Sequence, residues 1–139
     1  MTNTVQVETL TLDGARACLQ RAVAEAQAIS VPVCVAVVDQ AGRLLAFERM
    51  DGAATLSIQL AQDKAYTVTA FGLATADWYP LIADEPPLLH GIVKADRLMI
   101  FGGGVPVKVN GAIVGAVGVS GGSSDEDAQI AGVGASAVS

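Results

Sequence analysis

The sequence feature that most constrains the fold is an Asn-Gly pair between two strand-like runs. Asn110 and Gly111 separate residues 107–109 from residues 112–119, and both runs are rich in valine. Asn-Gly favours a type I′ turn, because that turn needs positive φ at both central positions. The apolar run 98–101 comes shortly before. This half of the chain therefore predicts three strands, the last two joined as a tight hairpin.

A second hairpin is predicted nearer the N-terminus. Residues 33–38 form a continuous apolar run with the length and β-branched content of a buried strand. Asp39 to Gly42 supplies turn chemistry, and residues 44–48 have the pattern of the returning strand. Strands joined by hairpins favour an antiparallel sheet over a doubly wound parallel one.

Helices account for most of the remaining chain. The last helix is expected to begin at the capping box Ser123-Ser-Asp-Glu126, whereas the stretch around Pro86 and Pro87 is expected to be irregular. The elements together predict an α/β domain of the α+β type, with a single five-stranded antiparallel sheet flanked by helices. Apolar residues at helical spacing place the other helices at 13–29, 56–71 and 75–82.

The bulk properties narrow the class of protein. A chain of 139 residues corresponds to one domain, spanning 1–139. Hydrophobic residues make up 52% and charged residues 16%, so part of the apolar surplus is expected in the interface of a homo-oligomer. The net charge of −6 and the scattered cations argue against nucleic-acid binding. No apolar run approaches the roughly eighteen residues of a membrane span.

The N-terminal residues, the two cysteines and the single histidine indicate the compartment, the state of the thiols and the absence of a His-rich metal site. The first eight residues lack the basic start and apolar core of a signal peptide, so a cytoplasmic protein is expected. Cys18 and Cys34 stand apart from any CxxC or Cys/His group, and we expect two buried free thiols. A single histidine argues against a His-rich metal site, and no metal site is predicted.

Lys64 is the first candidate site residue. At 100° per residue it lies in the middle of an apolar arc that includes Leu56, Leu60, Val68 and Phe71. An ammonium group there is costly unless it meets an anion or reaches an edge of the structure. Two interpretations stay open: a lysine that reaches solvent at the rim, and a lysine that faces a ligand.

The glycine-rich segments form the second candidate. Three glycines after a strand allow positive φ and close approach of a ligand or of another backbone. The segment matches neither a Walker A loop nor GxGxxG, so nucleotide binding is not indicated. Gly115 and Gly118, inside a predicted strand, are better explained by close helix-on-sheet packing. The candidate ligand-binding residues here are Gly102, Gly103, Gly104, Val105 and Pro106.

Four single residues complete the candidates. His90 is the lone imidazole and would need an orienting partner to act as a base or an axial ligand. Asp39, Arg49 and Arg97 are single charges at strand ends or in loops. Lys64, His90 and Asp39 are the candidates for catalysis, while Arg49 and Arg97 are candidates for ligand binding.

Taken together, these motifs resemble the GlcG/HbpS family over nearly the whole chain. The resemblance implies a profilin-like antiparallel sheet flanked by helices, homo-oligomers, and a pocket near the glycine-rich segments. Family members include haem-binding proteins, domains of PduO-type corrinoid adenosyltransferases, and proteins from catabolic gene clusters. The matching motifs are Val35-Ala-Val-Val-Asp39, the Gly42 turn, Lys64-Ala65, Gly102-Gly-Gly-Val-Pro106 and Gly111-Ala-Ile-Val-Gly-Ala-Val-Gly-Val-Ser-Gly-Gly122.

The chain departs from the haem-binding pattern of this family. In haem-binding relatives a histidine on the opening helix can serve as the iron ligand, whereas this helix carries Gln20, Glu25 and Gln27. Haem iron takes His, Cys, Met or Tyr. The resemblance therefore leaves haem as a possible cofactor without its usual ligand.

Three functions fit the sequence. The first is an oligomer that binds a small anionic or planar ligand near Lys64 and the segment 102–106. The second is a small catabolic enzyme, an isomerase, tautomerase or hydrolase, in which Lys64 or an arginine holds a substrate carboxylate and His90 or Asp39 moves a proton. The third is an accessory protein whose glycines serve packing only. The first is our preferred interpretation.

Overall fold

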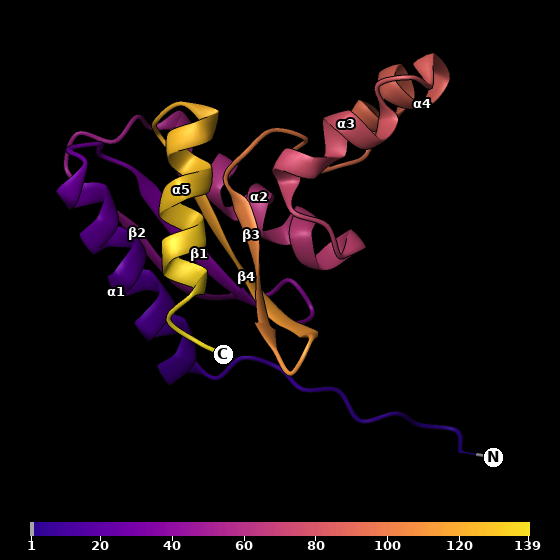
Figure 1. Cartoon of the computed structure of the whole chain (residues 1–139), viewed down its shortest axis with the longest axis horizontal. Helices are drawn as coiled ribbons and strands as arrows, with labels where there is room; N and C mark the ends of the chain where they lie inside the picture. Colours follow the sequence, from indigo (N-terminus) through magenta and orange to yellow (C-terminus); the bar gives the residue numbers. More distant parts are fainter. Residues whose placement is uncertain (1) are drawn as a thin grey trace.

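The chain folds as an antiparallel sheet with helices on both faces (Figure 1). The computed structural model describes residues 2–139. Within them the sheet has four strands in the order β2-β1-β4-β3, and every neighbouring pair is antiparallel. The elements in chain order are α1 (Leu12–Ala28), β1 (Cys34–Asp39), β2 (Leu44–Arg49), α2 (Leu56–Phe71), the 3₁₀ turn η1 (Thr75–Asp77), α3 (Trp78–Ile82), α4 (Pro86–Gly91), the 3₁₀ turn η2 (Ile92–Lys94), β3 (Gly104–Val109), β4 (Ala112–Ser120) and α5 (Ser124–Ala135).

The two predicted hairpins and the capping box are confirmed. Asn110 and Gly111 have φ of 52° and 81°, as a type I′ turn requires. In the first hairpin, Asp39 Oδ1 accepts hydrogen bonds from the backbone N–H groups of Ala41 and Arg43. Ser123 accepts from the N–H of Glu126, whose carboxylate accepts from the N–H of Ser123.

The prediction of a fifth strand at residues 98–101 is wrong, because the sheet has four strands and none of them includes these residues. The backbone N–H of Met99 donates to Oγ1 of Thr67 on α2 at 3.0 Å, and the N–H of Leu98 donates to the carbonyl of Ala95. Arg97 just before them has φ of 64°, which turns the chain out of an extended course. The segment therefore follows helix α2 and joins the sheet only at Gly104.

The stretch around Pro86 and Pro87 is also not irregular as predicted, because it forms the short helix α4. Proline is tolerated in the first helical turn, where its missing N–H would have no partner within the helix. In Figure 1, α3 and α4 project beyond the edge of the sheet.

The two faces of the sheet are packed differently. Helices α1 and α5 cover one face, on which large residues such as Val35, Val117 and Ile130 form the main core. Helix α2 covers the other face, where the contacts are made mostly by small side chains such as Cys34 and Ala61. Small residues let α2 approach the sheet closely, and this proximity places its polar side chains against strand backbone.

Both cysteines are free and buried, as predicted. Burial raises the pKa of the Cys18 thiol to about 11 and also raises that of Cys34. Both thiols therefore stay protonated and unreactive at neutral pH. Among residues 2–139, no helix has the length and apolar character needed to cross a membrane.

Candidate functional site

Two neighbouring residues of α2, Asp63 and Lys64, hold the two ends of the loop that leads into β3. Both are buried, with exposed fractions of 8% and 1%. Asp63 contacts Arg97 at the start of the loop, and Lys64 lies against Gly103 at its end. The segment 97–104 is thus fixed across helix α2 by one charged residue at each end.

Lys64 is part of a buried ion pair. Its Nζ donates to the carbonyl of Val119 at 2.9 Å and to Oδ2 of Asp127 at 3.1 Å. Asp127 lies in the first turn of α5, and its Oδ1 accepts from the N–H of Gly122 at 2.8 Å. Burial lowers the pKa of Lys64, and the Asp127 carboxylate opposes that shift. The lysine therefore points into the interior and not toward solvent at the rim.

The glycines beside Lys64 leave room for its side chain. Gly103 has φ of 136°, and a Cβ there would overlap the Val119 carbonyl and lie 2.7 Å from Lys64 Nζ. A Cβ on Gly104 would lie 2.6 Å from the carbonyl oxygen of Lys64 itself. Only glycine lets the loop close this tightly over α2. The ring of Phe101, 42% exposed, lies 4.9 Å from Lys64 Nζ and covers this region from outside.

Gly102, Val105 and Pro106 flank the two glycines that contact Lys64. A Cβ on Gly102 would lie 2.7 Å from the carbonyl of Ser124, so this glycine allows close contact with α5. Val105 and Pro106 belong to β3, an edge strand on which a missing N–H is tolerated. The structure thus brings Lys64 together with Gly103 and Gly104 of the predicted segment, while Gly102 contacts α5 and Val105 packs against the main core.

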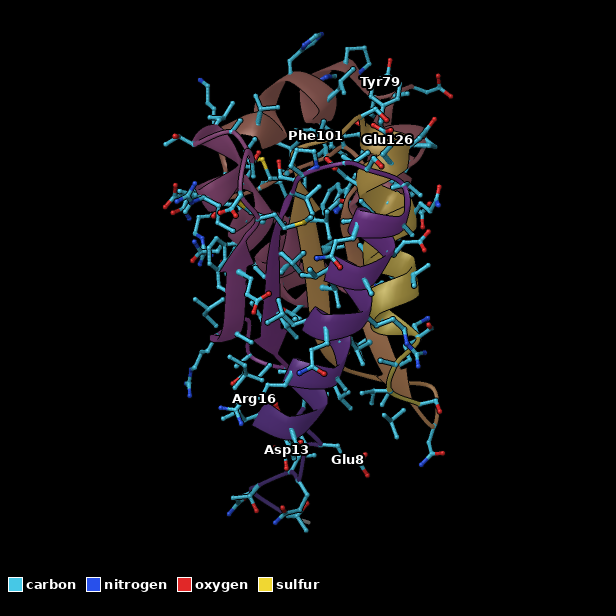
Figure 2. The ribbon with its side chains drawn as sticks, turned by 90° about the vertical axis from the view of Figure 1, so that its left-hand side faces the viewer. Glu8, Asp13, Arg16, Tyr79, Phe101 and Glu126 are labelled. Atoms are coloured by element: carbon cyan, nitrogen blue, oxygen red, sulfur yellow. The ribbon has the colours of Figure 1, made fainter. Side chains whose placement is uncertain are left out.

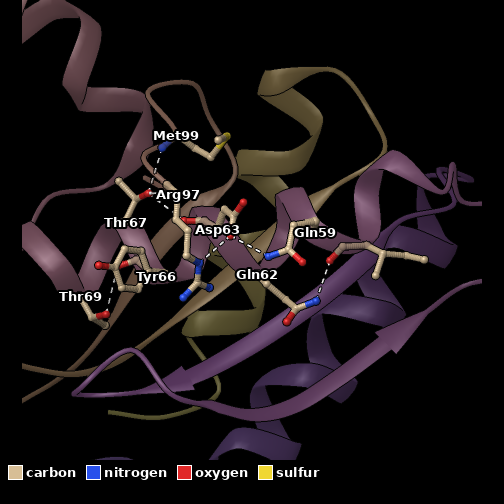
Figure 3. Close-up of polar contacts among 9 residues, drawn as sticks. Gln59, Gln62, Asp63, Tyr66, Thr67, Thr69, Arg97 and Met99 are labelled. Carbon is tan, nitrogen blue, oxygen red and sulfur yellow. Dashed lines mark hydrogen bonds and ion pairs between the residues drawn. The ribbon is translucent and has the colours of Figure 1, made fainter. Parts of the chain in front are cut away.

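At the other end of the loop, the conformation of Arg97 is defined by its backbone and by two side-chain contacts (Figure 3). Its backbone is left-handed, its Nε donates to Asp63 Oδ1 at 2.8 Å, and its guanidinium carbon lies 4.2 Å from the centre of the Tyr66 ring. Left-handed backbone is uncommon for a residue with a long side chain and occurs often at functional sites. The side chain remains 38% exposed, so the guanidinium is oriented without being enclosed.

The remaining candidates lie apart from this site. His90 is exposed on α4, and Arg49 is exposed at the end of β2. Asp39 is paired with Gly115 on β4, whereas Lys64 binds Val119 four residues further along that strand. That separation corresponds to roughly 13 Å along the strand. The structure therefore does not bring Asp39 to Lys64.

Sequence reasoning missed the acidic partners of both basic residues. Asp127 lies in the first turn of a helix, where acids are favoured in any case, so its position gives no sign of a buried partner. Asp63 is adjacent to Lys64 in sequence, but its side chain forms contacts in a different direction. The position of Lys64 could have indicated such a partner. An unpaired lysine on a buried helix face is strongly destabilising, so an acidic residue has to be expected opposite it.

Comparisons with known proteins match the whole domain. The family model of haem-degrading protein HbpS-like matches residues 10–136. An uncharacterised 15.0 kDa protein from the dhaT-dhaS intergenic region of Citrobacter freundii is 38% identical over 133 residues, which cover 94% of this chain and 93% of that protein. Protein GlcG of Escherichia coli K12 is 41% identical over 96 residues, 69% of each chain.

Solved structures agree with these sequence matches. The crystal structure of Klebsiella pneumoniae protein ORFY superposes with a TM-score of 0.92 at 33% identity, covering 99% of this chain and 95% of that one. The crystal structure of a PduOC–haem complex gives a TM-score of 0.83 at 30% identity, covering 94% of this chain and 95% of that one.

Proposed function

This chain belongs to the HbpS-like family, which includes GlcG, and on that basis we propose that it is an oligomeric protein that binds a small ligand. The proposed binding region is the loop 97–106 with Lys64 beneath it. One observation carries this proposal: a buried lysine is closed against a run of three glycines next to an exposed aromatic ring. Buried lysines are rare outside sites, and Phe101 offers a surface for a planar group.

In this proposal Lys64 stabilises the conformation of the loop and does not itself contact the ligand. Its ammonium neutralises Asp127 and binds Val119, which fixes Gly103 and the start of α5. The ligand contacts are then proposed to come from Phe101 and Pro106, with Arg97 at one end of the loop, whereas Val105 packs against the main core. Arg49, exposed at the end of β2, lies on the opposite edge strand of the sheet from β3 and has no part in this proposed region.

The test is a charge-free replacement of the ion pair. Lys64→Met combined with Asp127→Asn keeps the aliphatic length of the lysine and an acceptor for the N–H of Gly122. We expect a small molecule to co-purify with the parent protein, measured by mass spectrometry after denaturation, and we expect the double variant to fold and to lose that molecule. Lys108→Met, an exposed change on β3, is the matched control. A double variant that retains the parent's ligand would refute a role for Lys64 in the site.

Haem is a cofactor that the family suggests, but helix α1 of this chain carries Gln20, Glu25 and Gln27 and no histidine. Cys18 and Cys34 are wholly buried in the core, and His90 is exposed on α4. Met50 and Met99 are half-buried, and the ring of Tyr66 lies against the guanidinium of Arg97. Iron needs one of these residue types at an open position beside a cavity.

Hemin is therefore expected to bind weakly or not at all. Titration with one equivalent of hemin should give no sharp Soret shift. Gln20→His should create such a shift, because Gln20 borders a hollow of about 320 Å³ between α1 and β2. A sharp shift with the parent protein that persists in His90→Ala would contradict both the expected weak binding of hemin and the reasoning about its iron ligands.

The proposal of an oligomer is supported by large apolar side chains that are exposed to solvent in a single copy of the chain. Phe71, Leu81 and Val93 are 62%, 61% and 59% exposed, and they lie at the end of α2 and on the projecting arm of α3, α4 and η2 (Figure 1). Figure 2 places Tyr79 of this arm at the same end of the molecule as Phe101. A second copy of the chain would cover this surface.

Sedimentation velocity tests the assembly. At micromolar concentration we expect a species larger than the 14.1 kDa monomer. Leu81→Glu with Val93→Glu should shift the distribution to monomer, because charges are not tolerated in the core of an interface. Val5→Glu, at an 83% exposed valine in the N-terminal segment, is the matched control. A monomeric parent protein would refute the proposal.

A further inference from the structure

Arg97 lies beside a hollow in the surface whose lining combines two arginines with polar side chains. The hollow has a volume of about 450 Å³ and lies between α2 and the β1–β2 turn. Arg43 and Arg97 supply its positive charge, and Gln59, Gln62 and Tyr66 form its wall on the side of α2.

The two Nη groups of Arg97 are its unused donors. Nε is engaged by Asp63, and the guanidinium plane lies over Tyr66. Within residues 2–139, neither Nη group donates to a carboxylate. A guanidinium fixed in this manner matches a carboxylate that accepts two parallel hydrogen bonds. Its rotamer and backbone are set before the ligand arrives, which reduces the entropy lost on binding.

The two glutamines supply polar groups of both kinds. Gln59 Nε2 donates to Asp63 Oδ1 at 2.9 Å, and Gln62 Nε2 donates to the carbonyl of Ile58 at 3.0 Å (Figure 3). Each amide nitrogen thus uses one of its two N–H groups inside the protein, which leaves one N–H and the amide oxygen of each glutamine for a ligand. A hydroxyl group can both donate to such an oxygen and accept from such an N–H, while an anionic group pairs with Arg97.

We propose that the hollow at Arg97 binds a small hydroxycarboxylic acid. Its carboxylate accepts from the Nη groups of Arg97, with Arg43 adding positive charge, and its hydroxyl donates to a glutamine oxygen. This inference goes beyond the proposed function, because Arg97 is the one residue of the loop 97–106 that lines the hollow, and Lys64 does not line it.

The experiment uses three matched probes: lactate, propionate without the hydroxyl, and lactamide without the charge. Saturable chemical-shift changes at the Arg97 Nε–H are followed by NMR on the full chain. We expect lactate to bind at least tenfold more tightly than lactamide and more tightly than propionate, because a hydrogen bond to a charged group contributes about 1.5–3 kcal/mol, which is tenfold or more in affinity. Equal affinities for lactate and lactamide, or no saturable shift with any probe, would overturn the proposal.

Two variants separate this inference from the proposed function. Arg97→Asn removes the guanidinium while keeping a residue that tolerates positive φ, and it should abolish lactate binding as judged by backbone amide shifts around Gln59 and Gln62. If lactate still binds to Arg97→Asn but is lost in Lys64→Met with Asp127→Asn, Arg97 is not the anchor and the site lies at Lys64. Loss only in Arg97→Asn supports the inference and refutes a role for Lys64 in lactate binding.

Discussion

Replacing Asp127 with Ala is expected to lower the free energy of unfolding by about 3–5 kcal/mol, as measured by guanidinium denaturation. Lys64 is 1% exposed, so the variant leaves an ammonium in the interior with the Val119 carbonyl as its remaining hydrogen-bond partner. The N–H of Gly122 also loses its acceptor. Breaking a buried pair from one side costs much more than removing both partners, because the remaining charge is uncompensated.

The control is to remove both charges. Lys64→Met with Asp127→Asn should recover most of the lost stability, since no buried charge remains and the asparagine amide oxygen can accept from the N–H of Gly122 as the carboxylate does. If the double variant is as unstable as Asp127→Ala alone, the loss of stability came from the start of α5 and not from the uncompensated charge of the lysine.

The pH dependence of the Asp127→Ala variant identifies the lysine as the cause. Burial already lowers the pKa of Lys64 below 10.5, and loss of the carboxylate that raised it lowers the folded-state pKa further. Between that value and 10.5 the unfolded chain binds more protons, so stability rises with pH. The difference from the parent protein should therefore be smaller at about pH 9.5 than at about pH 7. An equal difference at both pH values would argue against an unpaired ammonium.

The sequence was sufficient for elements whose cause is local. The type I′ turn at Asn110, the capping box at Ser123 and the bounds of α2 all depend on residues within a few positions of each other. Residues 98–101 show the limit of that reasoning. Their apolar character is typical of a strand, but the hydroxyl of Thr67, 32 residues away from Met99, takes the hydrogen bond that a strand would have needed.

The buried face of α2 was predicted only in part. Lys64 and Val68 are buried as the helical arc indicates, but Leu56 and Phe71 are 73% and 62% exposed. The sheet opposite α2 presents small residues, so its closest contacts are with Ala61 and Ala65 instead of the larger side chains. Which side of a helix approaches a sheet most closely depends on the residues of the partner strands, and helical periodicity contains no information about them.

Substituting Gly118 with Ala is expected to lower the free energy of unfolding by about 3 kcal/mol, the upper end of the usual cost of overpacking, since the rigid backbone that the new Cβ meets has no low-cost relaxation. A Cβ on Gly118 would overlap the carbonyl of Ala61 and lie 2.7 Å from the N–H nitrogen of Ala65, both in the backbone of α2. To accommodate it, α2 must move away from β4, and Lys64 would move with it away from Val119.

Gly132→Ala in α5 is the matched control, because a Cβ there meets no atom within 4 Å, and alanine should stabilise the helix by about 0.5–1 kcal/mol. Thermal unfolding followed by circular dichroism measures both variants. A Gly118→Ala protein as stable as the parent would show that the close approach of α2 to the sheet is not what fixes the buried lysine in place.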